Sequence, residues 1–233
     1  MSPLIIALDF AQPEPALTLA KQLGSERCRV KVGKELFTRS GPFVVEELVK
    51  QGFDVFLDLK YHDIPNTVAQ ACLAAADLGV WMINVHALGG RNMLLAAREA
   101  LEKCSHCPLL VAVTILTSFD RFNLYEVGLH SGLEDNVLRL ARLSHACGLD
   151  GIVCSPREIV AVHKMLEMEL KTDFLLVTPG IRSKKSSNDD QKRVMTPAEA
   201  LKLGADYLVI GRPVTAAPSP LQALLEIEAS LSE

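Results

Sequence analysis

Apolar residues in this chain fall into two alternating kinds of segment. Short runs rich in Val, Ile and Leu predict buried strands, and stretches with apolar residues three and four apart predict helices. The eight predicted strands are Leu4–Phe10, Arg29–Gly33, Asp54–Lys60, Trp81–Ala87, Leu109–Leu116, Gly151–Ser155, Phe174–Ile181 and Tyr207–Arg212. The predicted helices are Glu14–Leu23, Gly41–Gln51, Pro65–Leu78, Asn92–Lys103, Glu134–Cys147, Arg157–Glu169, Pro197–Leu203 and Leu221–Leu231.

Regular alternation of strands and helices implies parallel strands joined by right-handed crossovers. Eight such repeats close naturally into a barrel, so the predicted fold class is α/β, a single (β/α)8 TIM barrel over residues 1–233. An open, doubly wound sheet is the alternative, but it usually has fewer strands. No G-x-G-x-x-G motif follows the first strand, which weakens a dinucleotide-binding interpretation. We expect no linker and no second domain.

Composition narrows the possible classes of function. The formal net charge of the 233 residues is −4, so the chain lacks the basic surplus typical of proteins that bind nucleic acid or anionic membranes. Its apolar runs are too short to span a bilayer, and no basic segment precedes the first strand. The six cysteines lie mostly in apolar segments and are expected to be reduced core residues. These features predict a cytoplasmic protein with no nucleic-acid or membrane partner.

Polar residues gather where the predicted strands end, which in a barrel is the face that carries function. Asp58 and Lys60 lie two positions apart on one strand, so strand alternation predicts that both project from the same face. Asp63 follows just past that strand, and charged residues are rarely buried unless they are paired. The alternative is a salt bridge at the rim with Asp63 as a helix N-cap before Pro65. Other strands contribute Asp9, Lys31, Asn84, His86, Thr117, Ser118 and Thr178.

Two loops near the C-terminus pair glycine with arginine, in Gly180-Ile181-Arg182 and Gly211-Arg212. Barrels often bind phosphate with the loops after strands 7 and 8. Glycine lets backbone N–H groups approach an oxyanion, and arginine adds a bidentate charge. Residues 183–193 are entirely polar, which suits either a solvated loop or a lid that closes over phosphate. Gln191 is the residue of this segment expected to contact a ligand, because its amide both donates and accepts.

The Lys/Asp cluster and the two Gly/Arg loops together predict an enzyme that acts on a small anionic phosphate ester. The residues also carry a family resemblance. Asp58-x-Lys60-x-x-Asp63 is similar to the signature of the orotidine 5'-phosphate decarboxylase suprafamily, and the longer string from Asp58 to Thr67 resembles the decarboxylase family itself. The matches run in order over nearly the whole chain, from residue 5 to residue 213. The other matching motifs are Ala7-Leu8-Asp9, Lys31-Val32-Gly33, Asn84-Val85-His86, Leu116-Thr117-Ser118, Val177-Thr178-Pro179-Gly180-Ile181-Arg182 and Val209-Ile210-Gly211-Arg212.

The resemblance implies a decarboxylation of orotidine 5'-monophosphate to UMP, the last step of de novo pyrimidine synthesis, without cofactor or metal. By position, Lys60 would donate a proton to C6 and Asp58 would sit beside the departing carboxylate. Asp63 and Thr67 would reach the active site of a neighbouring subunit, so the resemblance implies a homodimer. Lys31 would complete an alternating Lys/Asp network.

The same resemblance distributes the substrate among the remaining motif residues. Asp9 and Lys31 would hold the ribose hydroxyls, and Ser118 would contact the pyrimidine. Thr117 would lie near the ribose or the base, and Pro179 belongs to the same substrate-binding set. The phosphate would be held by Arg182, Gln191, Gly211 and Arg212.

Three rival interpretations remain open at this stage. Metal-dependent relatives, such as 3-keto-gulonate-phosphate decarboxylase or hexulose-phosphate synthase, share the Asp-x-Lys-x-x-Asp core but use Mg2+; the extension Ile64–Thr67 together with Thr117, Ser118 and Gln191 argues against them. A phosphate-binding barrel isomerase or synthase would explain Gly211 and Arg212 but not the charge cluster. A barrel that only binds a nucleotide would not need intact charges at its strand ends.

Overall fold

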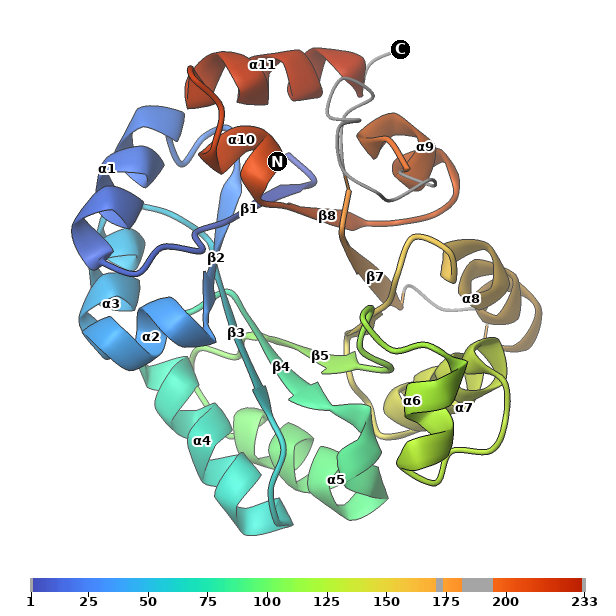
Figure 1. The fold of residues 1–233 in the computed structure, drawn as a ribbon. Coiled ribbons are helices and arrows are strands. Elements are labelled where there is room, and N and C mark those ends of the chain that lie inside the picture. The colour runs from blue at the N-terminus through green and yellow to red at the C-terminus, as the bar shows by residue number, and fades with distance from the viewer. Residues whose placement is uncertain (1, 171–173, 182–194, 232–233) are drawn as a thin grey trace.

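The computed structural model describes residues 2–170, 174–181 and 195–231, and in these residues the chain forms a closed barrel of parallel strands. Each strand pairs with its sequence neighbours, and β8 pairs with β1 to close the ring (Figure 1). The predicted (β/α)8 barrel is therefore confirmed. The strands are β1 (Leu4–Ala7), β2 (Arg29–Gly33), β3 (Val55–Tyr61), β4 (Met82–His86), β5 (Leu109–Val113), β6 (Gly151–Val153), β7 (Leu175–Pro179) and β8 (Tyr207–Ile210).

Helices form a ring around the barrel (Figure 1). A short turn η1 (Ala87–Gly89) precedes α5, and a wider turn η2 (Leu166–Leu170) extends α8. The helices are α1 (Pro13–Leu23), α2 (Lys34–Ser40), α3 (Phe43–Lys50), α4 (Pro65–Asp77), α5 (Gly90–Leu101), α6 (Arg121–Glu126), α7 (Leu133–Ala146), α8 (Ile159–Met165), α9 (Pro197–Lys202), α10 (Arg212–Thr215) and α11 (Pro220–Ser230).

Three of these helices, α2, α6 and α10, are absent from the sequence prediction. Each is short and buries one residue, Leu36, Leu124 or Val214 respectively. One buried position gives no 3.6-residue apolar repeat, so the pattern has nothing to detect. Local chemistry forms α6 instead: Asp120 and Asn123 make a reciprocal capping box at its N-terminus.

Two apolar layers hold the barrel together. The interior of the barrel is filled by Ile5, Ala7, Phe56, Met82, Val111, Val177 and Val209, and the larger layer lies between strands and helices. Alternation along β4 illustrates the division: Met82 faces the interior, while Ile83 and Val85 face the helices. Asn84 and His86 therefore share the interior face with Met82.

The amino ends of the strands are closed by a stack of side chains. The Arg29 guanidinium lies 4.4 Å from the centre of the Trp81 ring and 5.0 Å from that of Tyr207. Asp54 pairs with Arg29 at 3.2 Å. Because this end is plugged by packed aromatic rings and a paired cation, the opposite end of the barrel is the one available to a ligand.

Several predicted strands extend too far at that open end. β1 ends at Ala7 rather than Phe10, and β5 ends at Val113 rather than Leu116. The apolar run continues past the last strand pair because Leu8 and Ile115 are buried without belonging to a strand. Asp9 and the Thr117-Ser118 pair consequently lie in loops beyond their strands.

Candidate active site

A chain of ion pairs crosses the open end of the barrel from β1 to β3. Lys31 Nζ on β2 lies 3.1 Å from Asp9 Oδ1 and 3.4 Å from Asp58 Oδ2. Lys60 Nζ lies 2.6 Å from the other oxygen of Asp58. The order of charges is therefore Asp9, Lys31, Asp58, Lys60, alternating in sign, and the structure brings together these four residues named from the sequence.

The members of this network differ in how far their side chains are exposed at the mouth, the open end of the barrel. The side chains of Lys31 and Asp58 are 10% and 12% exposed, while Lys60 is 27% exposed and Asp9 is 66% exposed. Buried charges are stable only when paired, and here each buried charge has a partner of opposite sign. A ligand entering from the open end meets Asp9 and Lys60 before the more buried Lys31 and Asp58, and it finds the Lys60 ammonium already paired with Asp58.

Space for the Lys31 ammonium is provided by a glycine. A Cβ added to Gly33 would lie 3.1 Å from Lys31 Nζ and 3.4 Å from Asp9 Oδ1, which is tighter than most real Cβ contacts. The Lys31-Val32-Gly33 motif thus has a steric reason, because a side chain at residue 33 would press on the ion pair.

Lys60 reaches Asp58 through a break in β3, not through regular alternation. Residues Leu57 and Tyr61 pair with Ile83 and Val85, so four residue steps on β3 lie opposite two on β4. Within this bulge Lys60 has φ +53°, the only positive φ of a non-glycine residue in the described part of the chain. The predicted contact with Asp58 is present, but the regular alternation on which the prediction rested is interrupted by the bulge within β3.

Asn84 supports the bulge from β4. Its side chain accepts a hydrogen bond from the Lys60 backbone N–H at 2.8 Å and donates one to Asp58 Oδ1 at 2.6 Å. The sequence placed Asn84 at a strand end without assigning it a role. Its position two residues before His86, on the interior face, is the signal that links it to the site.

His86 lies one layer above Asn84, at the rim of the barrel. Its ring centre is 5.3 Å from that of His62, which follows β3. Burial, the neighbouring His62 and the cations Lys34 and Lys60 lower the pKa of His86 to about 4, against the opposing effect of Asp58. The imidazole is therefore neutral near pH 7, and its Nδ1 is buried without a hydrogen-bond partner among the described residues.

Asp63 and Thr67 are not part of the network within this chain. Both are exposed, and Asp63 makes no ion pair with any described residue; its Oδ1 accepts the Ile64 backbone N–H at 2.7 Å. The alternative of Asp63 as N-cap of α4 is wrong, because Ile64 occupies that position and no side chain caps the helix. Ile64 itself is 67% exposed, unusual for so large an apolar residue.

The predicted phosphate end is described in part. Pro179 closes β7, and Arg212 is exposed at the start of α10, which follows β8 directly. A Cβ on Gly211 would lie 3.9 Å from Asp9 Oδ2, so the β8–α10 turn adjoins the network. Arg182, Gln191 and the polar segment 183–193 lie outside the described residues. Thr117 and Ser118 are exposed in a turn four residues or more beyond β5.

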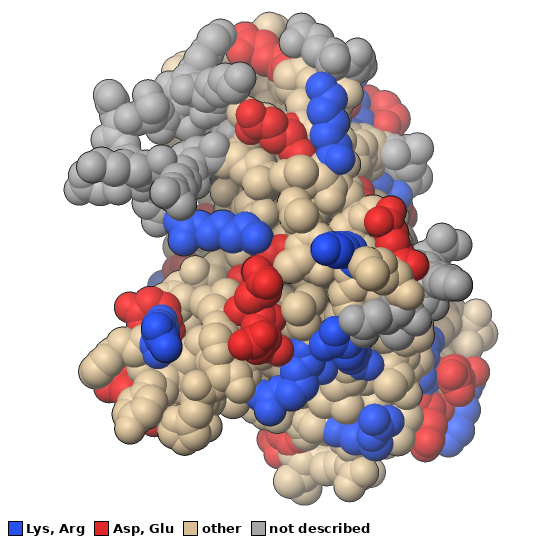
Figure 2. All heavy atoms as spheres, turned by 90° about the vertical axis from the view of Figure 1, so that its right-hand side faces the viewer, with Lys and Arg blue, Asp and Glu red and all other residues tan. Residues whose placement is uncertain are grey.

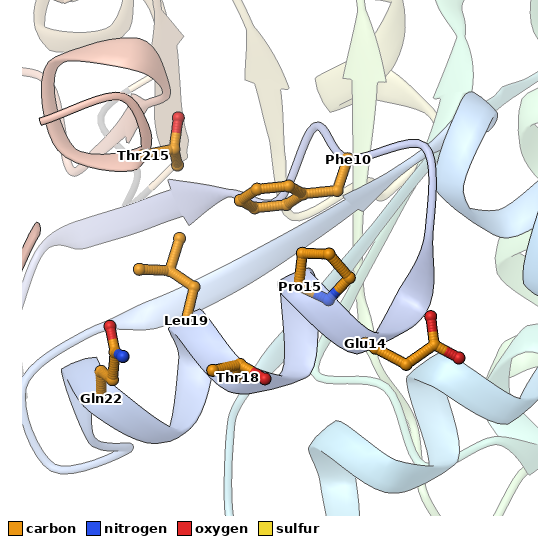
Figure 3. A pocket seen from close by; sticks show the side chains of 7 residues that line it. All are labelled: Phe10, Glu14, Pro15, Thr18, Leu19, Gln22 and Thr215. Atoms are coloured by element: carbon orange, nitrogen blue, oxygen red, sulfur yellow. The ribbon is translucent and has the colours of Figure 1, made fainter.

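A separate hollow of about 460 Å³ lies between α1 and α10, beside the mouth rather than in it. Figure 3 shows the Phe10 ring above Pro15, with Leu19 farther along α1. Glu14 is the one charged residue of its lining, so the hollow offers no cation to an anionic substrate. Its other lining residues are Phe10, Pro15, Thr18, Leu19, Gln22 and Thr215.

Taken together, this geometry can stabilise negative charge and deliver a proton in a partly desolvated site. The Lys60 ammonium is a group that can supply both the charge and the proton, and its ion pair with Asp58 restricts its direction. Among the described residues, no three His, Cys, Asp or Glu side chains converge as a set of metal ligands. Likewise, no described helix is long and apolar enough to cross a membrane.

Comparison with known proteins agrees with a barrel whose chemistry lies at the strand ends. The sequence model of the orotidine 5'-phosphate decarboxylase / HUMPS family matches residues 2–227. A protein named orotidine 5'-phosphate decarboxylase from Nitrosococcus oceani is 59% identical over 231 residues, covering 99% of this chain and 98% of the relative. One of the same name from Chromobacterium violaceum is 58% identical, covering 99% of this chain and 92% of the relative.

Solved structures give the same answer for the fold. The crystal structure of orotidine 5'-phosphate decarboxylase from Lactobacillus acidophilus matches with a TM-score of 0.86 and 38% identity, covering 99% of both chains. The fold and the charged mouth thus define a (β/α)8 barrel of the kind that acts on small ligands at its strand ends. This chain belongs to the orotidine 5'-phosphate decarboxylase / HUMPS family.

Proposed function

We propose that this protein decarboxylates orotidine 5'-monophosphate to UMP and CO2, the last step of de novo pyrimidine synthesis. The observation that carries the proposal is the alternating chain of Lys31, Asp58 and Lys60 at the barrel mouth, with contacts of 3.4 Å and 2.6 Å. Relatives that share more than half of its residues over nearly their full length bear the name of this activity.

The network suits the chemistry of this reaction. When the bond between C6 and the carboxylate breaks, the electron pair stays on C6 in the plane of the ring, where no π system delocalises it. The protein must then stabilise the carbanion electrostatically, and a preorganised ammonium beside C6 does so. Lys60 transfers a proton from Nζ to C6, giving UMP, and regains a proton from water. Asp58 holds the Lys60 ammonium in an ion pair and lies beside the departing carboxylate.

The remaining proposed contacts hold the ribose, the phosphate and the base of the nucleotide. Asp9 and Lys31 hold the ribose hydroxyls, and the turn from Gly211 to Arg212 holds the phosphate. Support comes from proximity: Gly211 adjoins Asp9, so a ribose on Asp9 would direct its 5'-phosphate toward α10. Arg182 and Gln191 complete the phosphate site, Ser118 contacts the pyrimidine, Thr117 lies near the ribose or the base, and Pro179 lines the pocket.

The active protein is proposed to be a homodimer with shared sites. Asp63 and Thr67 are exposed, Asp63 makes no ion pair with any described residue, and the exposed apolar Ile64 lies between them in the sequence. A second subunit would cover Ile64 and receive Asp63 beside its own Lys60. This arrangement gives Asp63 a cation, which it does not meet among the described residues of its own chain.

No metal or cofactor takes part in the proposed reaction. Mg2+ prefers free carboxylate oxygens, yet both oxygens of Asp58 are already engaged, one by Lys60 and Asn84 and the other by Lys31. The metal-dependent relatives would need one of these carboxylates to be released. A test for a metal requirement therefore distinguishes the proposed metal-independent reaction from that of the metal-dependent relatives.

The proposed setting is the cytoplasm, with the nucleotide and a second subunit as partners and neither nucleic acid nor membrane. On the face shown in Figure 2, lysine and arginine side chains are interspersed with aspartate and glutamate side chains. Nucleic-acid and membrane binders usually gather their cations in one patch. The net charge of −4 points in the same direction.

One assay tests the proposed function. Purified protein is mixed with orotidine 5'-monophosphate, and the loss of its absorbance is followed with UMP identified by chromatography. We expect turnover that is equal before and after exhaustive treatment with EDTA. A protein that releases no UMP from this substrate, with or without Mg2+, would contradict the proposal.

A further inference from the structure

Asn84 is almost fully buried, with 1% of its surface exposed, and its side chain lies between two residues of the charged network. It is the central residue of β4 and faces the barrel interior, as Met82 does. Polar side chains this buried are stable only when their hydrogen bonds are made. The family resemblance includes Asn84 in a motif but assigns no role to its amide.

The orientation of the Asn84 amide is fixed by its two partners. A backbone N–H can only donate, so the atom that meets Lys60 N must be the carbonyl oxygen, at 2.8 Å. An ionised carboxylate can only accept, so the atom that meets Asp58 Oδ1 must be the amide nitrogen, at 2.6 Å. One rigid group therefore connects the backbone of Lys60 to the side chain of Asp58.

The Lys60 backbone needs such a connection because of its conformation. A left-handed conformation is unfavourable for an L-residue, and it persists only where the surroundings enforce it. Here the β3–β4 ladder is interrupted between Leu57 and Tyr61, so the Lys60 N–H bonds to the side chain of Asn84 instead of to the backbone of β4. The amide thus occupies the place of the missing ladder partner.

We propose that Asn84 is a positioning residue for the decarboxylation: its amide holds the Lys60 backbone in the left-handed conformation and fixes Asp58 Oδ1, so that the ammonium of Lys60 is aimed at C6. This inference rests on the proposed function for its catalytic consequence, but not for its structural one. Replacement by an apolar residue would leave the Lys60 N–H unpaired in a buried place and free β3 to relax.

The first test replaces Asn84 with an isosteric apolar residue, in Asn84→Leu. We expect kcat to fall on the order of 100-fold, as for a misplaced catalytic group, while the Kd for UMP changes little. In its crystal structure Lys60 should leave the left-handed region. Asn136→Ala is the matched control, because Asn136 is also fully buried and donates to two carbonyls, at 3.0 and 2.9 Å, but in α7. It should lose stability and keep kcat.

The second test uses Asn84→Asp, which changes one atom. A neutral carboxyl at residue 84 can donate its O–H to Asp58 and accept the Lys60 N–H, as the amide does; the ionised carboxylate cannot donate. In this variant two carboxyl groups lie next to each other, and the negative charge of one raises the pKa of the other, so that the pair retains one proton up to a higher pH. Activity of this variant should therefore rise as the pH falls through that pKa. The charged or titratable groups around it are Asp58, Lys31, Lys60, His86 and Asp9.

These outcomes distinguish the two proposals. If the wild-type protein releases no UMP, the proposed function fails, yet the φ of Lys60 in the Asn84→Leu structure still decides whether Asn84 holds that backbone. If the wild type is active and Asn84→Leu keeps its kcat, the positioning role is wrong. It is equally wrong if kcat falls no further than in Asn136→Ala, or if Asn84→Asp shows no recovery toward low pH.

Discussion

The Lys60 ammonium lies 2.6 Å from Asp58 Oδ1, although the regular strand is interrupted between the two residues. The proton donor of the proposed reaction therefore begins paired with the carboxylate that would face the departing CO2. An ion pair of this kind restricts the direction of the ammonium. That direction matters at C6, where the proposed reaction delivers the proton.

Lys60→Ala should abolish nearly all turnover while UMP binding is retained. Loss of a general acid typically costs about 100- to 10,000-fold, and loss of the stabilising cation adds to that. The measurements are kcat from the absorbance assay and the Kd for UMP from calorimetry. Lys50→Ala, which removes an exposed lysine paired with Glu47 on α3, serves as the control. Turnover within tenfold of the wild type would remove Lys60 from its assigned role.

Exhaustive chelation should leave kcat and KM unchanged. Both oxygens of Asp58 already meet cationic or amide donors, so the most buried carboxylate of the network is not free for a hard cation. The check is an assay after dialysis against EDTA, with metal content measured by mass spectrometry. Activity that disappears with the metal and returns with Mg2+ would favour the metal-dependent relatives instead.

Arg212→Ala should raise KM strongly, and orotidine without its phosphate should be a far poorer substrate. Arg212 starts α10 at the turn that adjoins Asp9, where a charge-assisted bidentate contact would hold the phosphate. Steady-state kinetics on both substrates measure the effect. Arg39→Ala, an exposed arginine paired with Glu35 on α2, should behave as the wild type. Equal turnover of nucleoside and nucleotide would show that the β8–α10 turn does not bind phosphate.

The barrel could be predicted from sequence because strands buried on both faces read as continuous apolar runs. The same signal misplaced strand ends, because Leu8 and Ile115 are buried although both lie past the ends of their strands. Apolar pattern reports burial, whereas a strand boundary depends on hydrogen bonds to a neighbour. The short helix α6 was not predicted for a related reason: Leu124 is its one buried residue, which gives no helical apolar repeat.

The site could be predicted as a set of residues but not as a geometry. Asp58 and Lys60 do meet, yet the left-handed backbone that brings Lys60 to Asp58 leaves no mark in the sequence. The role of Asn84 depends on how β3 and β4 are aligned across the bulge, and this alignment is a property of two strands together. A pattern read along one strand does not contain it.

His86 should make the protein less stable in acid. Its pKa is lowered from 6.5 to about 4 in the folded protein, so between these values the unfolded chain binds a proton that the folded chain does not. Stability from His86 is therefore fully present above about pH 6.5 and is lost as the pH falls toward 4.

This loss should disappear in His86→Phe, whose urea midpoint should decline less steeply than that of the wild type between pH 6.5 and about 4. His130→Phe, which removes an exposed histidine beside Tyr125, should retain the wild-type slope. If the urea midpoints of the wild type and His86→Phe fall equally steeply with pH, protonation of His86 does not contribute to the loss of stability in acid.

The active site should be shared between subunits, which mixed dimers can test. Lys60→Ala and Asp63→Ala dimers should each be inactive alone. In a two-fold dimer each Lys60 would face the Asp63 of the other subunit, so a mixed dimer has one site with both lesions and one with neither. Random exchange makes about half of the dimers mixed, and about a quarter of wild-type activity should return.

The contrasting arrangement gives a different result from the same experiment. If Asp63 served the Lys60 of its own chain, every site in a mixed dimer would keep one lesion and mixing would restore nothing. The exposed position of Asp63, without an ion pair among the described residues, favours the shared site. Native mass spectrometry must first establish that the subunits exchange, and Lys60→Ala mixed with wild type gives the activity expected from dilution alone. After confirmed exchange, no activity above that of the two separate inactive dimers would leave each site within a single chain.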